Sequence, residues 1–462
     1  MLFNSLQFLI FFLVITLAYY QLPNQKSRTW LLLLASCYFY MAFVPKYILI
    51  LGGTIVIDYF AGLQISGSRG KARRNWMLVS IVANVGILVF FKYFNFIFSN
   101  LEPLLHLVSP ERNMPMLDIL LPIGLSFHTF QAMSYIIEVY RGNQPPERNF
   151  ITYALYVMFY PQLVAGPIER PQNVLPQLHV YHDYNWNNVK EGLSRMLWGM
   201  FKKVVIADRL AIAVDHAFGN TDSQSSTQLM VAAIFYSFQI YCDFSGYSDI
   251  GIGAAKVMGI RLMENFNEPY RAGNIQQFWS RWHISLSTWF RDYVYIPLGG
   301  NRLGEARRKL NVMIVFLLSG LWHGANWTFV IWGGLHGALT AFLPGRKEQG
   351  LHKFMSRYVF VAVNFLLVTL LWIFFRAPGL SEAAAYIKGI ASVRNGNGVF
   401  GLNMTESLLA VGLIVFMLYV ERKRKSYLIS RNWLFLLYAV VMAAVCYLLG
   451  VFNENQFIYF QF

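Results

Sequence analysis

The stretch NVMIVFLLSGLWHGANWTFVIWGGLHG, residues 311–337, decides how this chain folds. It is long and apolar enough to enter a lipid bilayer, yet it carries His323 near its middle and His336 near its end. Gly320, Gly324 and Asn326 permit a turn beside His323. A turn or an imidazole at membrane depth is tolerated only when it is buried in protein or lines a wet cavity. The region 311–343 is therefore interpreted as a hairpin that enters the membrane and returns.

The composition indicates a membrane protein. Of the 462 residues 56% are hydrophobic and 13% are charged, against about 25% charged residues in a soluble domain. The mean hydropathy is +0.42, and the apolar residues come in long runs. We predict an all-α polytopic membrane protein with about ten spanning helices plus re-entrant or broken helices. The expected spans are 6–22, 29–44, 46–64, 76–99, 117–140, 198–218, 229–258, 358–376, 405–420 and 431–451, besides the hairpin.

The charge pattern sets the expected orientation. The formal net charge is +15, but the basic residues lie in short loops between apolar runs, so they indicate cytoplasmic loops and no nucleic-acid partner. With these loops inside, both termini are extracytoplasmic. The first run, 6–20, reads as a retained span because no basic segment precedes it and no cleavage site follows it. The basic loops are NQKSR (24–28), SGSRGKARRN (66–75), GGNRLGEARRKL (299–310), GRKEQGLHK (345–353) and ERKRK (421–425).

The chain reads as one integral membrane domain, 1–462, with N-terminal spans (1–140), a core with re-entrant segments (141–343) and C-terminal spans (344–462). No internal repeat is visible, which disfavours an inverted-repeat transporter. The three cysteines, Cys37, Cys242 and Cys446, lie far apart in apolar runs. They indicate neither a metal site nor a disulfide framework.

His323 lies 13 residues beyond the basic loop 299–310. In a helix this is roughly 20 Å into a hydrocarbon core about 30 Å thick. A neutral imidazole at that depth has an unperturbed pKa near ~6.5 and can take a proton from a hydroxyl or thiol that attacks an acyl carbonyl. A histidine bonded to a backbone carbonyl of the helix bundle explains the pattern equally well.

A second polar island, NIQQFWSRWHISLSTWFRDYVYIPLGGNR, covers residues 274–302. Four aromatic residues are spaced by 4, 7 and 4 positions, which predicts one helical face: Phe278, Trp282, Trp289 and Tyr293. Four polar residues are interleaved with them: Arg281, His283, Arg291 and Asp292. These charges are too costly for a span that faces lipid. The segment is either an amphipathic interfacial helix or a re-entrant segment whose polar groups line a cavity.

A third island, YCDFSGYSDIGIGAAK (241–256), places Asp243 and Asp249 within an expected span. We expect each carboxylate to be bonded to neighbouring helices. The sequence has no serine nucleophile elbow, phosphate-binding loop or zinc spacing. It thus offers a base without an obvious protein nucleophile, which favours direct transfer between two bound substrates.

Several motifs resemble the membrane-bound O-acyltransferase family over nearly the whole chain, in its bacterial alginate O-acetylation-type branch. They are PIGLSFHTFQAMSY (122–135), FYPQLVAGPIERP (159–171), YCDFSGYSDIGIG (241–253), FWSRWHISLSTWFRDYVYIPLGGNR (278–302), GLWHGANWTFVIWGGLHG (320–337) and FFRA (374–377). The resemblance implies helices in a ring around a thin core pierced by a tunnel. The family's invariant histidine matches His323, and its second histidine position matches His283.

For activity, the resemblance implies transfer of an acetyl group from a cytosolic thioester, acetyl-CoA, toward an exported partner of the SGNH hydrolase type that modifies a polysaccharide. The location implied is the bacterial cytoplasmic membrane, with no bound cofactor or metal. D-alanyl transfer to teichoic acid from a carrier protein remains an alternative. So does a channel or polysaccharide-export subunit without chemistry.

We assign His323 as the base and His283 as a hydrogen-bond donor or as an orienting residue for the thioester. The residues expected to bind substrate are Arg281, Trp282, Arg291, Asp292, Trp322 and Asn326. The residues expected at the cytoplasmic mouth, where they either attract a phosphorylated donor or only fix topology, are Arg302, Arg307, Arg308 and Lys309.

Overall fold

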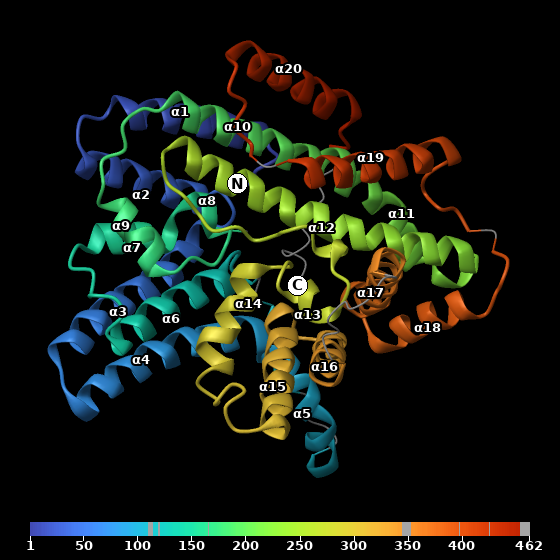
Figure 1. Ribbon diagram of the computed structural model, residues 1–462. Helices are drawn as coiled ribbons and strands as arrows, with labels where there is room; N and C mark the ends of the chain where they lie inside the picture. The colour runs from blue at the N-terminus through green and yellow to red at the C-terminus, as the bar shows by residue number, and fades with distance from the viewer. Residues whose placement is uncertain are drawn as a thin grey trace. The chain divides into compact units, whose positions relative to one another are not determined.

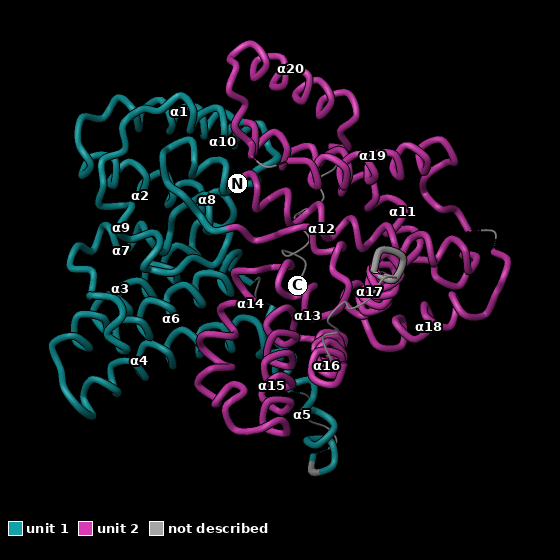
Figure 2. Tube along the Cα trace, in the orientation of Figure 1, with its two compact units in different colours: residues 1–193, 251–263 teal, residues 194–250, 264–462 magenta. Residues whose placement is uncertain are grey.

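The computed structural model describes residues 1–109, 114–118, 121–164, 166–343, 353–396, 398–424 and 426–452. Every regular element within these ranges is a helix, which confirms the all-α prediction (Figure 1). The chain divides into two compact units (Figure 2). Unit 1 comprises residues 1–193 and 251–263, and unit 2 comprises 194–250 and 264–462. Neither the single membrane domain nor the ring with a tunnel is tested by this division, so both stay predictions.

Among the described residues, six helices are long and apolar enough to cross a membrane. This finding agrees with a polytopic membrane protein. The other expected spans also form helices, but these are shorter or more polar. The six are Pro45–Gly67, Gly70–Leu107, Ser226–Val257, Arg357–Arg376, Met404–Lys423 and Asn432–Leu449.

Unit 1 is a helical bundle in which polar side chains begin helices and join them. Ser5 and Asn149 accept backbone N–H groups at the starts of two of its helices, as N-cap residues do. Asp58 is fully buried and accepts hydrogen bonds from Ser80 Oγ (2.5 Å) and Asn84 Nδ2 (2.8 Å), which ties two spans together. Its elements are α1 (Leu6–Gln21), α2 (Gln25–Met41), η1 (Pro45–Tyr47), α3 (Ile48–Gly67), α4 (Gly70–Leu88), η2 (Val89–Tyr93), α5 (Phe94–Val108), α6 (Leu125–Arg141), α7 (Phe150–Met158), α8 (Tyr160–Leu163) and α9 (Pro171–Leu178).

Two helices, α10 (Trp186–Met200) and α12 (Ser226–Val257), contribute to both units. The other elements of unit 2 follow α10 along the chain. They are η3 (Phe201–Ala207), α11 (Asp208–Gly219), η4 (Thr221–Ser223), η5 (Pro269–Arg271), α13 (Ile275–Trp279), α14 (Ile284–Phe290), η6 (Arg291–Tyr295), α15 (Glu305–His323), α16 (Trp327–Phe342), α17 (Lys353–Arg376), α18 (Leu380–Ala391), α19 (Met404–Lys423) and α20 (Asn432–Leu449).

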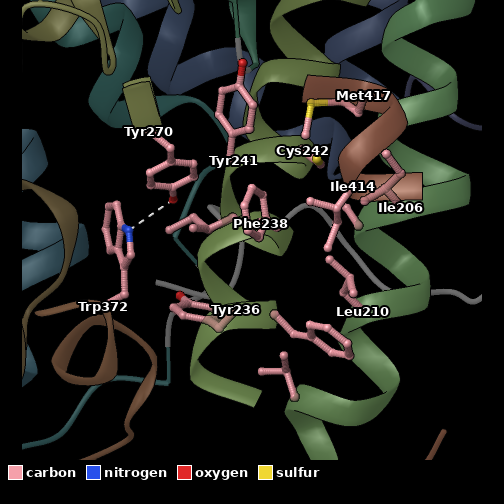
Figure 3. Packing of buried hydrophobic residues seen from close by; sticks show 14 of the residues in the cluster. Ile206, Leu210, Tyr236, Phe238, Tyr241, Cys242, Tyr270, Trp372, Ile414 and Met417 are labelled. Carbon is pink, nitrogen blue, oxygen red and sulfur yellow. Dashed lines mark hydrogen bonds between the residues drawn. The ribbon is translucent and has the colours of Figure 1, made fainter. Parts of the chain in front are cut away.

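The main core of unit 2 is aromatic. Figure 3 shows Phe238, Tyr241 and Cys242 of α12 packed with side chains from α11, α19 and α17. Tyr270 is held in this core by two hydrogen bonds: its hydroxyl accepts from Trp372 Nε1 (3.2 Å) and donates to the Ser237 carbonyl (2.5 Å). These bonds satisfy the polar ends of large side chains that are otherwise buried for their apolar area.

The boundaries of several expected spans were wrong. The span 76–99 belongs to a helical stretch from Gly70 to Val108, and the span 198–218 belongs to one from Trp186 to Gly219. Charged residues at the ends of these helices are helical, but they are too polar to be counted in an apolar run. The runs therefore gave limits inside the helices. The span 117–140 begins as a helix only at Leu125. The short helices α7 and α18 were not anticipated. The cytoplasmic loop expected at 345–353 lies almost wholly outside the described residues.

Candidate active site

His323 is the last residue of α15 and is 3% exposed. The chain leaves the helix through Gly324, and Asn326 then begins α16 by accepting a hydrogen bond from Thr328 N (3.0 Å). Residues 305–342 therefore form a helical hairpin, as two helices that pack side by side (Figure 1). Its entry into the membrane stays a prediction. Because α15 is continuous from Glu305, the estimate of roughly 20 Å between the basic loop and His323 applies.

One detail of the hairpin differs from the prediction. Gly320 does not make a turn, because it lies inside α15. A Cβ atom on Gly320 would overlap the carbonyl oxygen of Phe329, and one on Gly333 would overlap the carbonyl oxygen of Phe316. Small residues on facing helices allow the backbones to approach closely. The glycines thus let α15 and α16 pack together and leave the turn to Gly324–Asn326.

The segment that carries His283 is not one helix, so the single aromatic face predicted for 274–302 is wrong. The chain forms α13, breaks at Ser280–His283, and then forms α14 and η6. His283 itself has φ 44° and ψ 55°, in the left-handed region. Non-glycine residues adopt this conformation only where surrounding contacts hold it. A helical periodicity of four aromatic residues could not reveal this break.

The structure nevertheless brings the two motif histidines together. The ring centroids of His283 and His323 are 6.5 Å apart, and the side chains are 0% and 3% exposed. Their proximity was expected because both segments are joined to the loop 299–310. The structure reaches this proximity in a different way from the one expected. His283 lies in a sharp turn ahead of α14, and His323 lies at the end of α15. The two segments are not two parallel helices at equal depth. Both histidines belong to unit 2.

His283 is held by polar residues that the sequence analysis missed. Its Nδ1 lies 3.1 Å from Oδ1 of Asn265, which also accepts from Ser285 Oγ at 2.9 Å. Asn265 Nδ2 donates to Ser248 Oγ of α12 (3.3 Å). The edge of Phe244, also in α12, packs on the imidazole, with centroids 4.6 Å apart. The sequence around Asn265 has no hydrophobic periodicity that would single this residue out. The only sequence feature that could have pointed to it is a run of polar residues next to the aromatic segment 274–302.

His323 lies among aromatic rings of the hairpin and of α17. Its ring is 5.1 Å from Trp332 and 5.2 Å from Phe375. The ring of His336 also lies near Trp332, at 4.8 Å; His336 is fully buried and accepts a hydrogen bond from Trp279 Nε1 (3.2 Å). His336 therefore joins α16 to α13.

The carboxylates of the third island are bonded to a neighbouring helix, as expected. Asp243 pairs with Lys203 (2.7 Å), and Asp249 pairs with Lys202 (2.6 Å) and Arg195 (2.8 Å). All five side chains are about 10% exposed or less. Buried ion pairs of this kind fix the relative position of two helices more reliably than they add stability.

The residues expected to bind substrate do not all gather around the two histidines. Trp282 is 1% exposed and stacks on Phe278 in the core. Arg291 pairs with Asp292 (2.8 Å) and is 60% exposed. Asn326 begins α16 and donates to the Pro378 carbonyl (2.8 Å), which is a structural role.

Trp322 is closer to the histidine pair. Its ring lies 4.9 Å from His323 and 6.1 Å from His283. Arg281 is half-buried, in the break between α13 and α14. Binding roles for these residues remain predictions.

The expected donor-attracting residues lie at the start of α15 and in the loop before it. Arg302 and Arg307 are exposed. Arg308 donates two hydrogen bonds to Glu305 (2.7 and 2.6 Å), and these bonds hold the pKa of the Glu305 carboxyl below its usual value. Lys309 lies over the ring of Phe342, 5.0 Å from its centroid. The described residues contain no group of three or more His, Cys, Asp or Glu side chains that could hold a metal ion.

Comparison with known proteins agrees with this architecture. Residues 143–343, which include both motif histidines, match the model of the membrane-bound O-acyltransferase (MBOAT) family. The chain is 40% identical over 387 residues to a probable alginate O-acetylase AlgI from Pseudomonas aeruginosa, covering 83% of this chain and 73% of the relative. It is 38% identical over 434 residues to a peptidoglycan O-acetyltransferase from Helicobacter pylori, covering 86% and 81%.

A more distant relative is a teichoic acid D-alanyltransferase from Bacillus subtilis, 27% identical over 247 residues, which are 50% of this chain and 60% of the relative. With apolar helices long enough to span a bilayer and similarity over most of its length, the protein is a multi-pass membrane acyltransferase. The chain belongs to the MBOAT family and is an O-acyltransferase.

Proposed function

We propose that this enzyme moves an acetyl group from a cytosolic thioester, acetyl-CoA, across the bacterial cytoplasmic membrane for O-acetylation of an extracytoplasmic polysaccharide. An exported partner of the SGNH hydrolase type passes the group to the polymer. Both termini face the extracytoplasmic side, and the basic loops face the cytoplasm. The observation that carries the proposal is the pair of buried imidazoles, His283 ahead of α14 and His323 at the end of α15, 6.5 Å apart.

The chemistry follows from what an imidazole pair can do. An acceptor hydroxyl attacks the thioester carbonyl while one imidazole takes its proton, and a hydrogen-bond donor stabilises the oxyanion of the tetrahedral intermediate. When the C–S bond breaks, the proton returns to the thiolate. No covalent intermediate on the protein is needed, and a buried site keeps water away from the thioester.

The choice of acetyl over D-alanyl rests on the relatives. Those of about 40% identity are named as O-acetylases, whereas the D-alanyltransferases are about 27% identical. Alginate and peptidoglycan are both glycans with free hydroxyl groups, so a sugar hydroxyl is the shared chemistry of the final acceptor. An enzymatic role now replaces the alternative of an export subunit without chemistry.

The proposal is tested with the protein in sealed vesicles that contain labelled acetyl-CoA in the lumen corresponding to the cytoplasm. Label should appear as a base-labile ester on an acceptor outside the vesicle, in the presence of the exported partner. A His323→Ala, His283→Ala double variant that inserts normally is the control. Transfer of D-alanyl from a carrier protein, with none from acetyl-CoA, would overturn the donor assignment.

A further inference from the structure

Three side chains in one row along α16 have a buried polar atom without a hydrogen-bond partner among the residues that the structure describes. The atoms are Nε1 of Trp332, Nε2 of His336 and Oγ1 of Thr340. Trp332 and His336 are 0% exposed. Residues four positions apart are neighbours on the surface of a helix. Since most buried polar groups in folded proteins are paired, a row of three indicates a ligand that pairs with them.

The chemistry of two of these atoms fixes which kind of hydrogen bond they make. Trp279 Nε1 of α13 donates to Nδ1 of His336 (3.2 Å). An indole N–H group only donates, so Nδ1 of His336 carries the lone pair, and in the neutral imidazole Nε2 carries the hydrogen. Nε1 of Trp332 is likewise a donor only. The two residues thus offer N–H groups that suit carbonyl oxygens, and the Thr340 hydroxyl both donates and accepts.

A fourth unpaired atom lies beside Thr340. Gln276 of α13 donates through Nε2 to the backbone carbonyls of Thr340 (3.1 Å) and Leu343 (2.7 Å), and these bonds identify which end of its amide is the nitrogen. The amide oxygen, Oε1, is buried and has no partner within the described part of the chain. It can only accept. We call Trp332, His336, Thr340 and Gln276 the polar row.

The polar row leads from the basic entrance of the hairpin to His323. Near Thr340, the carbonyl of Ala341 accepts a hydrogen bond from Nη2 of Arg308 (3.0 Å). At the other end, the ring of Trp332 lies 5.1 Å from the ring of His323. Thr340 and Trp332 are eight residues apart, which is about 12 Å along a helix. A ligand bound along the row therefore extends from the basic residues to the imidazole.

Uncharged aromatic rings surround the row. Trp332 packs against Trp279 and against Trp372 of α17, with ring centroids 5.8 and 5.6 Å apart. His336 stacks on Phe278, 6.3 Å away. Apolar walls with a few placed polar groups are typical of sites for small organic ligands. Such walls suit an uncharged chain that carries amide groups, and they do not suit a phosphate.

The acyl thioesters of coenzyme A and of carrier proteins both contain a chain of this kind. In each, the sulfur ends a pantetheine arm, which is uncharged and carries two amide groups, and the phosphate begins beyond the arm. Four bonds separate the two amides and extend about 5 Å. A step of four residues along a helix is ~6 Å. The amides of the arm therefore match the spacing of the polar row.

We propose that the polar row binds the pantetheine arm of the acyl donor. The N–H groups of Trp332 and His336 donate to the amide carbonyls of the arm, and the oxygens of Thr340 and Gln276 accept from its amide N–H groups. The thioester at the end of the arm then lies beside His323, and the phosphate remains at the basic entrance. The inference rests on the proposed function, because it presupposes a thioester donor.

The first test pairs variants of the row with a donor that lacks amides, as in a double-mutant cycle. The donors are S-acetylpantetheine and the acetyl thioester of mercaptoethanol. Trp332→Phe and Thr340→Val should each lower kcat/KM for S-acetylpantetheine by about 3- to 10-fold, the effect of one hydrogen bond. For the amide-free donor the change should stay below about twofold. Trp433→Phe and Thr405→Val are matched controls, since they remove the same groups at exposed positions of α20 and α19.

Equal losses with both donors would overturn the proposal, because a packing defect or a lost structural water affects any thioester alike. His336 adds a further comparison. His336→Gln keeps an N–H donor and an acceptor for Trp279, whereas His336→Leu keeps neither. The Gln variant should therefore retain more activity than the Leu variant with S-acetylpantetheine, and the two should not differ with the amide-free donor.

The second test needs no acyl transfer. Pantetheine itself should bind the wild-type protein in lipid nanodiscs, and Thr340→Val should raise its Kd by about 3- to 10-fold, with Thr405→Val unchanged. Coenzyme A and a carrier protein that bears the arm are compared as competitors, and the stronger one identifies the source of the arm.

No binding of pantetheine, or an identical Kd in wild type and Thr340→Val, would overturn the inference. A different result would reject the acetyl assignment and leave the inference standing: pantetheine binds as expected, and the D-alanyl thioester of pantetheine is a substrate while S-acetylpantetheine is not. The failure of the proposed donor and the failure of the polar row are thus distinguished.

Discussion

The two segments that carry the motif histidines reach the same place by different means. In 305–342, a regular helix ends at His323, and glycines let the next helix pack against it. In 274–303, three short helices are separated by turns, and His283 lies in the left-handed region between two of them. The first segment is set by local periodicity. The second is set by contacts with Asn265 and α12, which are far away in the sequence. The difference shows that a helix end can place a residue unaided, whereas a turn with a precise side-chain orientation needs partners.

One test of this contrast concerns His283. If His283 donates a hydrogen bond to the oxyanion, His283→Ala should lose about 10²–10³-fold in rate, and His283→Asn, which keeps an N–H group, should lose less. Asparagine tolerates the left-handed backbone, so folding is preserved. Initial rates of acetyl transfer in vesicles measure the effect, with His106→Asn, at a half-buried position, as a control. An Asn variant no more active than the Ala variant would contradict the donor role predicted from the sequence.

His323 should show the complementary pattern. His323→Ala should lower the rate by about 10²–10⁴-fold, as the loss of a general base does. His323→Gln should be as inactive as His323→Ala, because an amide cannot serve as a base. The two variants are compared at equal membrane content, measured by immunoblot. A correctly inserted His323→Gln variant much more active than His323→Ala would contradict the base role of His323.

The close packing of the hairpin is tested by adding single methyl groups. Gly320→Ala and Gly333→Ala should each destabilise the protein by about 1–3 kcal/mol, since the new Cβ atom overlaps backbone on the facing helix. Gly334→Ala is the matched control, because its Cβ would meet only a Leu317 methyl group at an ordinary distance of 3.6 Å. Thermal unfolding in detergent gives the comparison. Equal stability of all three variants would mean that the helices do not pack as described.

The smallest effect is expected at the basic entrance of the hairpin. Arg302→Glu and Arg307→Glu reverse two exposed charges and should raise the apparent KM for acetyl-CoA several-fold at low salt, an effect that salt screens. Arg308 is less suitable because its guanidinium is bonded to Glu305. Donor kinetics are measured on vesicles with normal insertion. Unchanged KM would leave these residues a topological role only.

The sequence by itself was enough for the class of fold and for naming the two histidines that the structure brings together. Long apolar runs without charge are stable in a bilayer and not in water. In lipid the backbone N–H and C=O groups must bond to one another, and a single segment can do this only as a helix. An all-α polytopic architecture therefore follows from the composition. His323 was found for the same reason, since an ionisable residue at helical depth is conspicuous. The span limits at Gly70 and Trp186 were missed because hydropathy detects lipid-facing residues and not where a helix begins.

Only the tertiary structure decided how the second half of the site is built. Regular spacing suggested that Phe278, Trp282, Trp289 and Tyr293 share one helical face, but backbone hydrogen bonds to Asn265 break the helix at His283. The orientation of His283 depends on an amide 18 residues away, which is bonded in turn to Ser248 and Ser285. Periodicity records only which residues lie on one side of a regular element. The direction of a hydrogen bond depends on atoms that meet after the chain has folded.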